Sequence, residues 1–472
     1  MKSALLLWLA WGATFAAQAH GFEERYDLPV PLAYVIAGAC ACVLLTFIVA
    51  VVWMRRPDVA QARPTTSTGL LTCGAKQPTF CHGLAKGISF FLFVLTLASA
   101  LWGTRDPLMN LAPTLIWIGW WVGLSFAVII LGNIWPLLDP WRTLFELLNA
   151  AVRMAGRRNG IALNWPWPAR IGRWPATLLL LVWCGLEVIY PIAMSPFKLG
   201  CLAVTWSVFN VTGMVCFGRE VWQRHADVFA VYFSALGRQI GNRPTAESEA
   251  PVAGEVGFVL AMLSTVLFDG LHGSATWAYF EGALVAWAPQ WLDTNGYVAG
   301  GIGLITVWLI FVAAYRLTCQ LCFALMPIPT SGFGNPLARL FLPTLIPIAA
   351  AYLIAHNFSN LLIQGQTLIS LLSDPLGRQW DILGMAKFYP DIGLVDAKLT
   401  WTVALVAIVG GHVISIWRAH RLALSVGLSA QHTALTSLPL TLLMVVYTGI
   451  SLMVLAAPMV SNAPERWVNF GV

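Results

Sequence analysis

The stretch from Val30 to Trp53, VPLAYVIAGACACVLLTFIVAVVW, contains no charged residue. A helix of about 20 apolar residues crosses the roughly 30 Å hydrocarbon core of a membrane, so this stretch is long enough to span it. Of the 472 residues, 58% are hydrophobic and 10% are charged, whereas soluble proteins carry roughly 25% charge. The sequence therefore predicts an all-α, polytopic integral membrane helix bundle and excludes an ordinary soluble enzyme.

Residues 1–19, which precede this stretch, have the features of a secretory signal peptide. Lys2 is followed by an apolar core and by the small residues Ala17 and Ala19. We expect cleavage after Ala19; the alternative is an uncleaved first anchor. Cleavage would make His20 the first residue, and its free α-amine and imidazole together would form a chelate that favours copper. Alternatively, His20 only begins a frayed tail.

Apolar runs separated by polar interruptions predict ten membrane-spanning helices in the mature chain. We expect residues 20–472 to form a single transmembrane domain, with outer segments near 269–298 and 364–398. The expected spans are 30–53, 87–103, 112–138, 175–193, 199–217, 252–268, 299–322, 341–363, 399–417 and 435–457.

The distribution of basic residues predicts the orientation of these spans. Most of the 27 Lys and Arg residues fall in loops that lie inside if the mature N-terminus lies outside, as the positive-inside rule requires. The chain is thus predicted to be a multi-pass membrane protein, with both termini on the outer side and the lipid bilayer as its partner. The net charge of +6 comes without a basic cluster interleaved with aromatic residues, so no nucleic-acid binding is expected.

A few ionisable residues fall within the predicted spans, where each is costly and usually faces the bundle interior with a partner. We expect those of the outer half, together with His20, to converge on one pocket. The alternative is that Glu187 and His356 are satisfied by polar or aromatic neighbours and only specify helix packing. The ionisable residues are Glu187 in the fourth span, Asp269 and His272 at the outer end of the sixth, His356 in the eighth, and His412 and His420 in the ninth.

Imidazoles with a carboxylate are a ligand set for a divalent metal, which polarises a phosphoryl oxygen or generates a bound hydroxide. Copper or zinc is the expected ion. No P-loop, G-x-S-x-G, C-x-x-C-H or H-E-x-x-H motif occurs, which disfavours the chemistries that depend on them. The candidate ligands are His20, Asp269, His272, His356, His412 and His420.

Several short strings occur along most of the chain in a characteristic order. They are His20-Gly21, Arg25, Asp27-Leu28-Pro29-x-Pro31, Glu187 with Pro191, Ala355-His356-x-Phe358, Gly365-Gln366, Ser373-Asp374-Pro375, Gly377-Arg378, Trp380-Asp381, Gly384, Gly411-His412 and Ala419-His420-Arg421.

In these strings the chain resembles the fenitrothion hydrolases, bacterial polytopic membrane proteins that hydrolyse organophosphate triesters and have more than one subunit. The resemblance implies that water attacks phosphorus and an aryl oxide departs, and that the substrate is a small apolar molecule. It also implies a second protein subunit and a bacterial cytoplasmic (inner) membrane as the location. In the mechanism we expect, Glu187, His356 and His412 are ligands or proton-relay groups, while Asp374 and Asp381 orient substrate or water.

Two other functions remain open from the sequence. A ten-helix bundle with buried His and Glu is what a proton-coupled permease or a copper-handling membrane protein needs. Gly410-Gly411 is a possible helix break of the kind found in transporters, but we find no paired counterpart. The third possibility is a non-catalytic subunit of a membrane enzyme complex.

Overall fold

The computed structural model describes residues 26–54, 79–190, 195–238, 252–287, 296–326, 336–425 and 430–461. The predicted signal peptide and His20 lie outside these residues. The described part is all-α apart from two short strands, β1 (Tyr26–Asp27) and β2 (Val460–Ser461). It includes nine helices that are long and apolar enough to cross a membrane. The prediction of a polytopic membrane protein is therefore confirmed.

Each of these nine helices falls on one of the ten predicted spans. The remaining span, predicted at 175–193, is represented by a helix of 15 residues, α8 (Trp174–Val188). At a rise of 1.5 Å per residue α8 is about 22 Å long, shorter than a typical hydrocarbon core. The span predicted at 112–138 ends early, at Leu131, because Gly132 has a φ of +90° and turns the chain out of the helix.

Contacts divide the chain into two compact units. The first unit comprises residues 1–57, 263–364 and 390–472, and the second comprises residues 58–262 and 365–389. The single-domain organisation stays a prediction, and each unit is described by itself.

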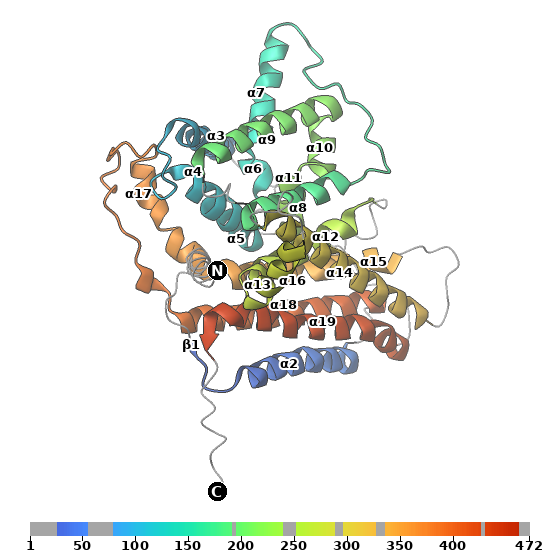
Figure 1. Cartoon of the computed structure of the whole chain (residues 1–472). Helices are drawn as coiled ribbons and strands as arrows, with labels where there is room; N and C mark the ends of the chain where they lie inside the picture. The colour runs from blue at the N-terminus through green and yellow to red at the C-terminus, as the bar shows by residue number, and fades with distance from the viewer. Residues whose placement is uncertain are drawn as a thin grey trace. The chain divides into compact units, whose positions relative to one another are not determined.

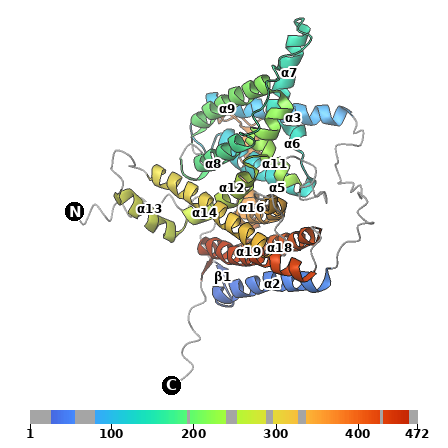
Figure 2. The ribbon, with the colours of Figure 1, turned by 90° about the vertical axis from the view of Figure 1, so that its right-hand side faces the viewer.

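The first unit is a bundle in which α2 (Leu32–Trp53) lies alongside α18 (Ala397–Ser425) and α19 (Ala430–Met459) (Figures 1 and 2). α18 also packs closely on α16 (Leu342–Gln364). The unit further contains the end of α12 (Glu255–His272), α13 (Ala275–Trp287), α14 (Tyr297–Ala324), α15 (Pro336–Leu340) and the 3-10 turn η6 (Ile392–Leu394).

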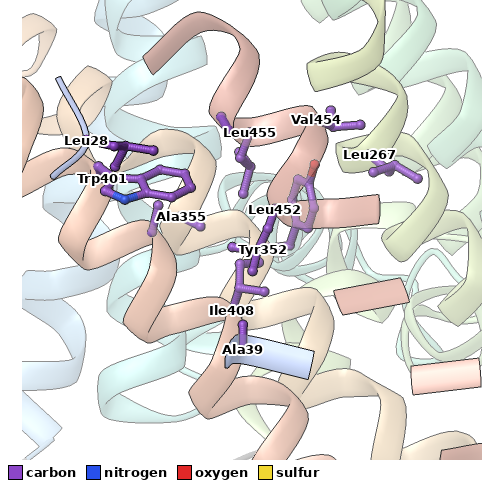
Figure 3. Packing of buried hydrophobic residues seen from close by; sticks show 12 residues of the cluster. Leu28, Ala39, Leu267, Tyr352, Ala355, Trp401, Ile408, Leu452, Val454 and Leu455 are labelled. Carbon is purple, nitrogen blue, oxygen red and sulfur yellow. The ribbon is translucent and has the colours of Figure 1, made fainter. Parts of the chain in front are cut away.

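Small residues allow the helices of this bundle to approach one another. α18 runs without interruption through Gly410 and Gly411, so the helix break considered there is not present. A Cβ on Gly411 would lie 2.4 Å from the Cβ of Ala351 and 2.9 Å from the carbonyl oxygen of Pro347. Gly411 is therefore a contact point of α16 with α18. Figure 3 shows the core beside it, where Tyr352 lies among Ile408, Leu452 and Leu455.

The second unit contains shorter helices and a dense cluster of aromatic side chains that includes Trp120, Trp121 and Phe229. A π-helical segment, η3 (Leu115–Gly123), carries these two tryptophans. The other helices are α3 (Thr79–Trp102), α4 (Leu111–Thr114), α5 (Leu124–Leu131), α6 (Trp135–Leu138), α7 (Pro140–Met154), α8, α9 (Pro196–Phe217), α10 (Arg219–His225), α11 (Val228–Gly237), the start of α12, and α17 (Thr367–Ser373).

Candidate functional site

The first unit holds an imidazole–carboxylate pair. His356 on α16 and Asp269 on α12 meet with 2.7 Å between Nε2 and Oδ2. The imidazole is 8% exposed and the carboxylate 34%. An ionisable group in a membrane-spanning helix needs such a partner, because an isolated charge there is costly. The sequence placed both residues in the outer half of the bundle, and the structure brings them into contact.

Tyr352 lies one helical turn before His356 on α16, so the two side chains share a face. Its side chain is fully buried, and its hydroxyl has no hydrogen-bond partner among the described residues. The hydroxyl lies within electrostatic range of Asp269. A Cβ on Gly270 would lie 3.4 Å from this oxygen, an ordinary contact distance, so the hydroxyl lies next to the residue that follows Asp269. Tyr352 is a polar group of the site that sequence reasoning missed; its i−4 spacing from His356 was the available signal.

His272 belongs to the same end of α12, three residues after Asp269. The helix continues through His272, so Asp269 and His272 lie on the same face, as the sequence predicted. The imidazole lies within electrostatic range of Asp269 and of Glu281 on α13. Its ring also packs against Trp277, with 5.8 Å between the ring centroids. The end of α12 thus presents a second imidazole near the pair.

The two histidines of α18 are buried. His412 is completely inaccessible, and its Nδ1 lies 2.8 Å from the carbonyl oxygen of Ile408. A carbonyl oxygen only accepts, so Nδ1 carries the proton and Nε2 keeps a lone pair. That Nε2 is buried with no partner in the described ranges. His420 is 2% exposed and packs edge-on against Phe47, with 6.1 Å between the ring centroids.

Glu187 lies in the second unit, on α8. Its carboxylate accepts a 3.0 Å hydrogen bond from the indole Nε1 of Trp121, which is the kind of partner that the packing alternative expects. Convergence of Glu187 with the histidines of the first unit stays a prediction.

Asp374 and Asp381 organise the loop that follows α17. Asp374 accepts the backbone N–H groups of Arg378 and Gln379 at 2.9 and 2.7 Å. Asp381 accepts the backbone N–H of Ala386 and the hydroxyl of Ser373, and these bonds lower the pKa of its carboxyl. Both carboxylates thus stabilise this loop, and their predicted role towards a substrate stays a prediction.

The described side chains do not supply a complete metal site. Over the described ranges, no group of three or more His, Cys, Asp and Glu side chains is arranged to hold a metal ion. The imidazole nitrogen of His356 that faces Asp269 is engaged by the carboxylate. A copper or zinc site would need a further ligand, and His20 lies outside the described residues. The metal therefore stays a prediction.

The second unit also contains a buried pair of carboxyl groups that was not anticipated. Asp139 and Asp227 cap α7 and α11, and both side chains are almost completely buried. Asp139 accepts the backbone N–H groups of Trp141 and Arg142, and Asp227 is 3.4 Å from the amide nitrogen of Asn210. Asp-Pro before an amphipathic run is a helix-start signal, so the cap of α7 was readable from the sequence. Its burial was not.

No family model, curated protein or solved structure matches the chain. The structure shows a multi-pass membrane protein with an Asp–His pair whose imidazole is almost buried and whose carboxylate is partly exposed.

Proposed function

We propose that this protein is a membrane-embedded hydrolase of small, uncharged phosphotriesters and that Asp269 and His356 form its acid–base pair. The observation that carries the proposal is the 2.7 Å contact between an almost buried imidazole and a carboxylate that remains one-third exposed. The reaction class comes from the resemblance to the fenitrothion hydrolases. A partly exposed carboxylate beside an imidazole is a candidate base for the water that attacks phosphorus.

The pair shares one proton between Nε2 and Oδ2 at rest. Asp269, the more exposed partner, orients a water molecule, and the pair takes a proton from it as the water oxygen bonds to phosphorus. The phosphorus–oxygen bond to the aryl group breaks, and the aryl oxide leaves with the bonding electrons. The pair then returns the proton to the aryl oxide, so one water and one triester become one diester acid and one phenol. His356 stabilises the charge that appears on the pair during the reaction.

The helix α13 gives an apolar substrate a surface to approach along. Its side chains Tyr279, Phe280 and Trp287 are 76%, 55% and 86% exposed. Amphipathic rings of this kind gather at the level of the lipid head groups, where a greasy neutral ester also partitions. Trp277 is buried instead, because its ring packs where a Cβ on Gly303 would lie.

The short strands support the predicted orientation with both termini outside. β1 pairs in parallel with β2, Tyr26 opposite Val460 and Asp27 opposite Ser461. The start of α2 and the end of α19 therefore lie on one side of the bilayer, which requires an even number of crossings. The nine long helices of the described chain give such a number only if the short helix α8 also crosses, which the span predicted at 175–193 implies. The distribution of Lys and Arg favours the outer side as this common side, and the resemblance implies a bacterial cytoplasmic membrane.

The test is hydrolysis of a chromogenic aryl phosphotriester by the full-length protein in membranes and after purification in mild detergent. Any subunit that co-purifies is retained, because the resemblance implies one. Asp269→Asn and His356→Gln keep hydrogen-bonding capacity but remove the acid–base function, and each is expected to lower kcat about 100-fold or more. Asp391→Asn, on an exposed loop, is the matched control. Full activity in both pair variants would refute the assignment.

A proton-coupled permease is the second candidate, favoured by His412. Its buried Nε2 lone pair and the buried hydroxyl of Tyr352 have no task in the hydrolysis just described. Polar groups at such depth are typical of proton relays in transporters. Proteoliposomes that take up protons on addition of a solute, with His412→Gln losing that uptake while hydrolysis is absent, would favour the permease over the hydrolase.

A further inference from the structure

The second unit encloses a cavity of about 390 Å³, within the range of roughly 300–1,000 Å³ typical of ligand pockets. It lies where α6, α10 and α11 meet the start of α8, and polar side chains make up much of its wall. Gly237 keeps the turn before α6 close to α11, since a Cβ there would lie 2.5 Å from the backbone nitrogen of Asn133. The polar residues on its wall include Asn133, Arg173, Gln223, Arg224, Ser234 and Arg238.

Three guanidinium groups line the cavity. Arg173 is 6% exposed, and such burial of a charge is unusual without a specific partner. Its Nη1 bonds Glu255 at 2.7 Å and its Nε donates to the carbonyl oxygen of Arg224 at 3.2 Å, which fixes the side chain. Arg224 and Arg238 are exposed. The planar donor array of Arg suits the oxygens of a phosphate group.

A tryptophan forms part of the same wall. Trp135 lines the cavity and is 1% exposed. Its indole Nε1 is itself inaccessible and has no hydrogen-bond partner within the part of the chain that the structure describes. The positive charge of the cavity therefore comes from its arginines, and the indole ring adds an apolar wall.

The acidic groups near the cavity leave this positive character in place. Glu255 is already bonded to Arg173. Asp139 lies behind Gln223, whose side-chain amide donates to it. Burial, and then the nearby Asp227, raise the pKa of Asp139 to about 8, so its carboxyl is mostly protonated at neutral pH.

We infer that this cavity binds a phosphate group, carried by a free phosphate compound or by the head group of an anionic lipid, and that Arg224 and Arg238 contact its oxygens. The site is independent of the proposed hydrolase pair, which lies in the first unit. The positive-inside prediction puts all three arginines on the inner face of the membrane, where both sources of phosphate are present.

The test separates the two sources with one set of variants. Delipidated full-length protein in detergent is dialysed against radiolabelled inorganic phosphate, and the protein as first purified is extracted and assayed for retained phospholipid. Arg224→Gln and Arg238→Gln each remove one charged donor, so we expect binding in at least one arm to fall about tenfold or more. Arg157→Gln and Arg158→Gln change exposed arginines outside the cavity and are expected to have no effect.

Loss of phosphate binding alone identifies a free phosphate compound as the ligand, and loss of retained lipid identifies a head group. The inference is overturned if neither ligand binds the unaltered protein, or if the cavity variants and the two controls behave alike. Thermal unfolding of each variant, followed by tryptophan fluorescence, shows that the variants compared are folded.

Discussion

Replacing Asp139 by Asn should remove a large part of the pH dependence of stability. Burial, followed by repulsion from Asp227, raises the pKa of the folded carboxyl from its ordinary value of 3.8 to about 8. Between these two values the folded state binds more protons than the unfolded state. The free energy of unfolding therefore falls as the pH rises through that range.

The size of the effect follows from the two pKa values. From pH 6 to pH 8 the folded carboxyl changes from almost fully protonated to half protonated, while the unfolded carboxyl stays ionised. Where the folded carboxyl holds a whole proton that the unfolded carboxyl lacks, each pH unit lowers the free energy of unfolding by about 1.4 kcal/mol. Stability therefore falls by about 2 kcal/mol over this interval. Asp227, whose pKa burial raises to about 6, adds only a fraction of this amount. In a unit of this size, 2 kcal/mol corresponds to roughly 4 to 8 °C in Tm.

The Asp139→Asn substitution removes the titrating carboxyl but keeps the helix cap of α7. Asn is about as good a helix cap as Asp, so the bonds from the backbone N–H groups of Trp141 and Arg142 are kept. Gln223 can turn its amide to donate or to accept.

The assay is thermal unfolding in detergent at pH 6, 7 and 8, with Asp106→Asn as a control on an exposed loop. We expect Tm to fall with pH in the wild type and the control, and to fall much less in Asp139→Asn. Equal slopes in all three proteins would refute the reasoning.

Three further predictions concern packing and charge. Gly411→Ala should destabilise the first unit by about 1–3 kcal/mol, because the added Cβ would overlap α16. Gly410→Ala should be neutral or slightly stabilising, because no atom lies within 4 Å of the position of its Cβ. Denaturation of the two variants compares their stabilities directly. Removing one partner of a fully buried ion pair costs roughly 3–5 kcal/mol. Glu255→Gln should lower the stability of the second unit by somewhat less, since Glu255 is 22% exposed, and thermal unfolding measures the loss. Asp381→Asn should loosen the loop after α17 without unfolding the protein, which proteolysis of that loop would detect.

The membrane fold was predictable because hydrophobicity is a property of each segment alone. Every long apolar helix of the described chain falls on a predicted span, although α8 is shorter than the run at 175–193 suggested. One helix end was predicted wrongly because local backbone geometry determines it. Gly132 ends a helix whose apolar pattern continues to Leu138. In contrast, the adjacent glycines of α18 do not break it, since a helix accepts glycine where a neighbouring helix packs closely.

The candidate site was only partly predictable, because a pair is a property of two helices. Asp269 and His356 were each recognisable as costly residues near the outer ends of their spans, yet no pattern in either helix indicates the 2.7 Å contact between them. Asp139 is harder still, since its partners come from α7, α10 and α11 and its burial depends on all of them. A polar residue within a long apolar run stands out in a sequence, whereas one between short amphipathic helices looks like an ordinary loop residue. The buried carboxyl groups of the second unit and its arginine-lined cavity could therefore be recognised only from the packing of the helices.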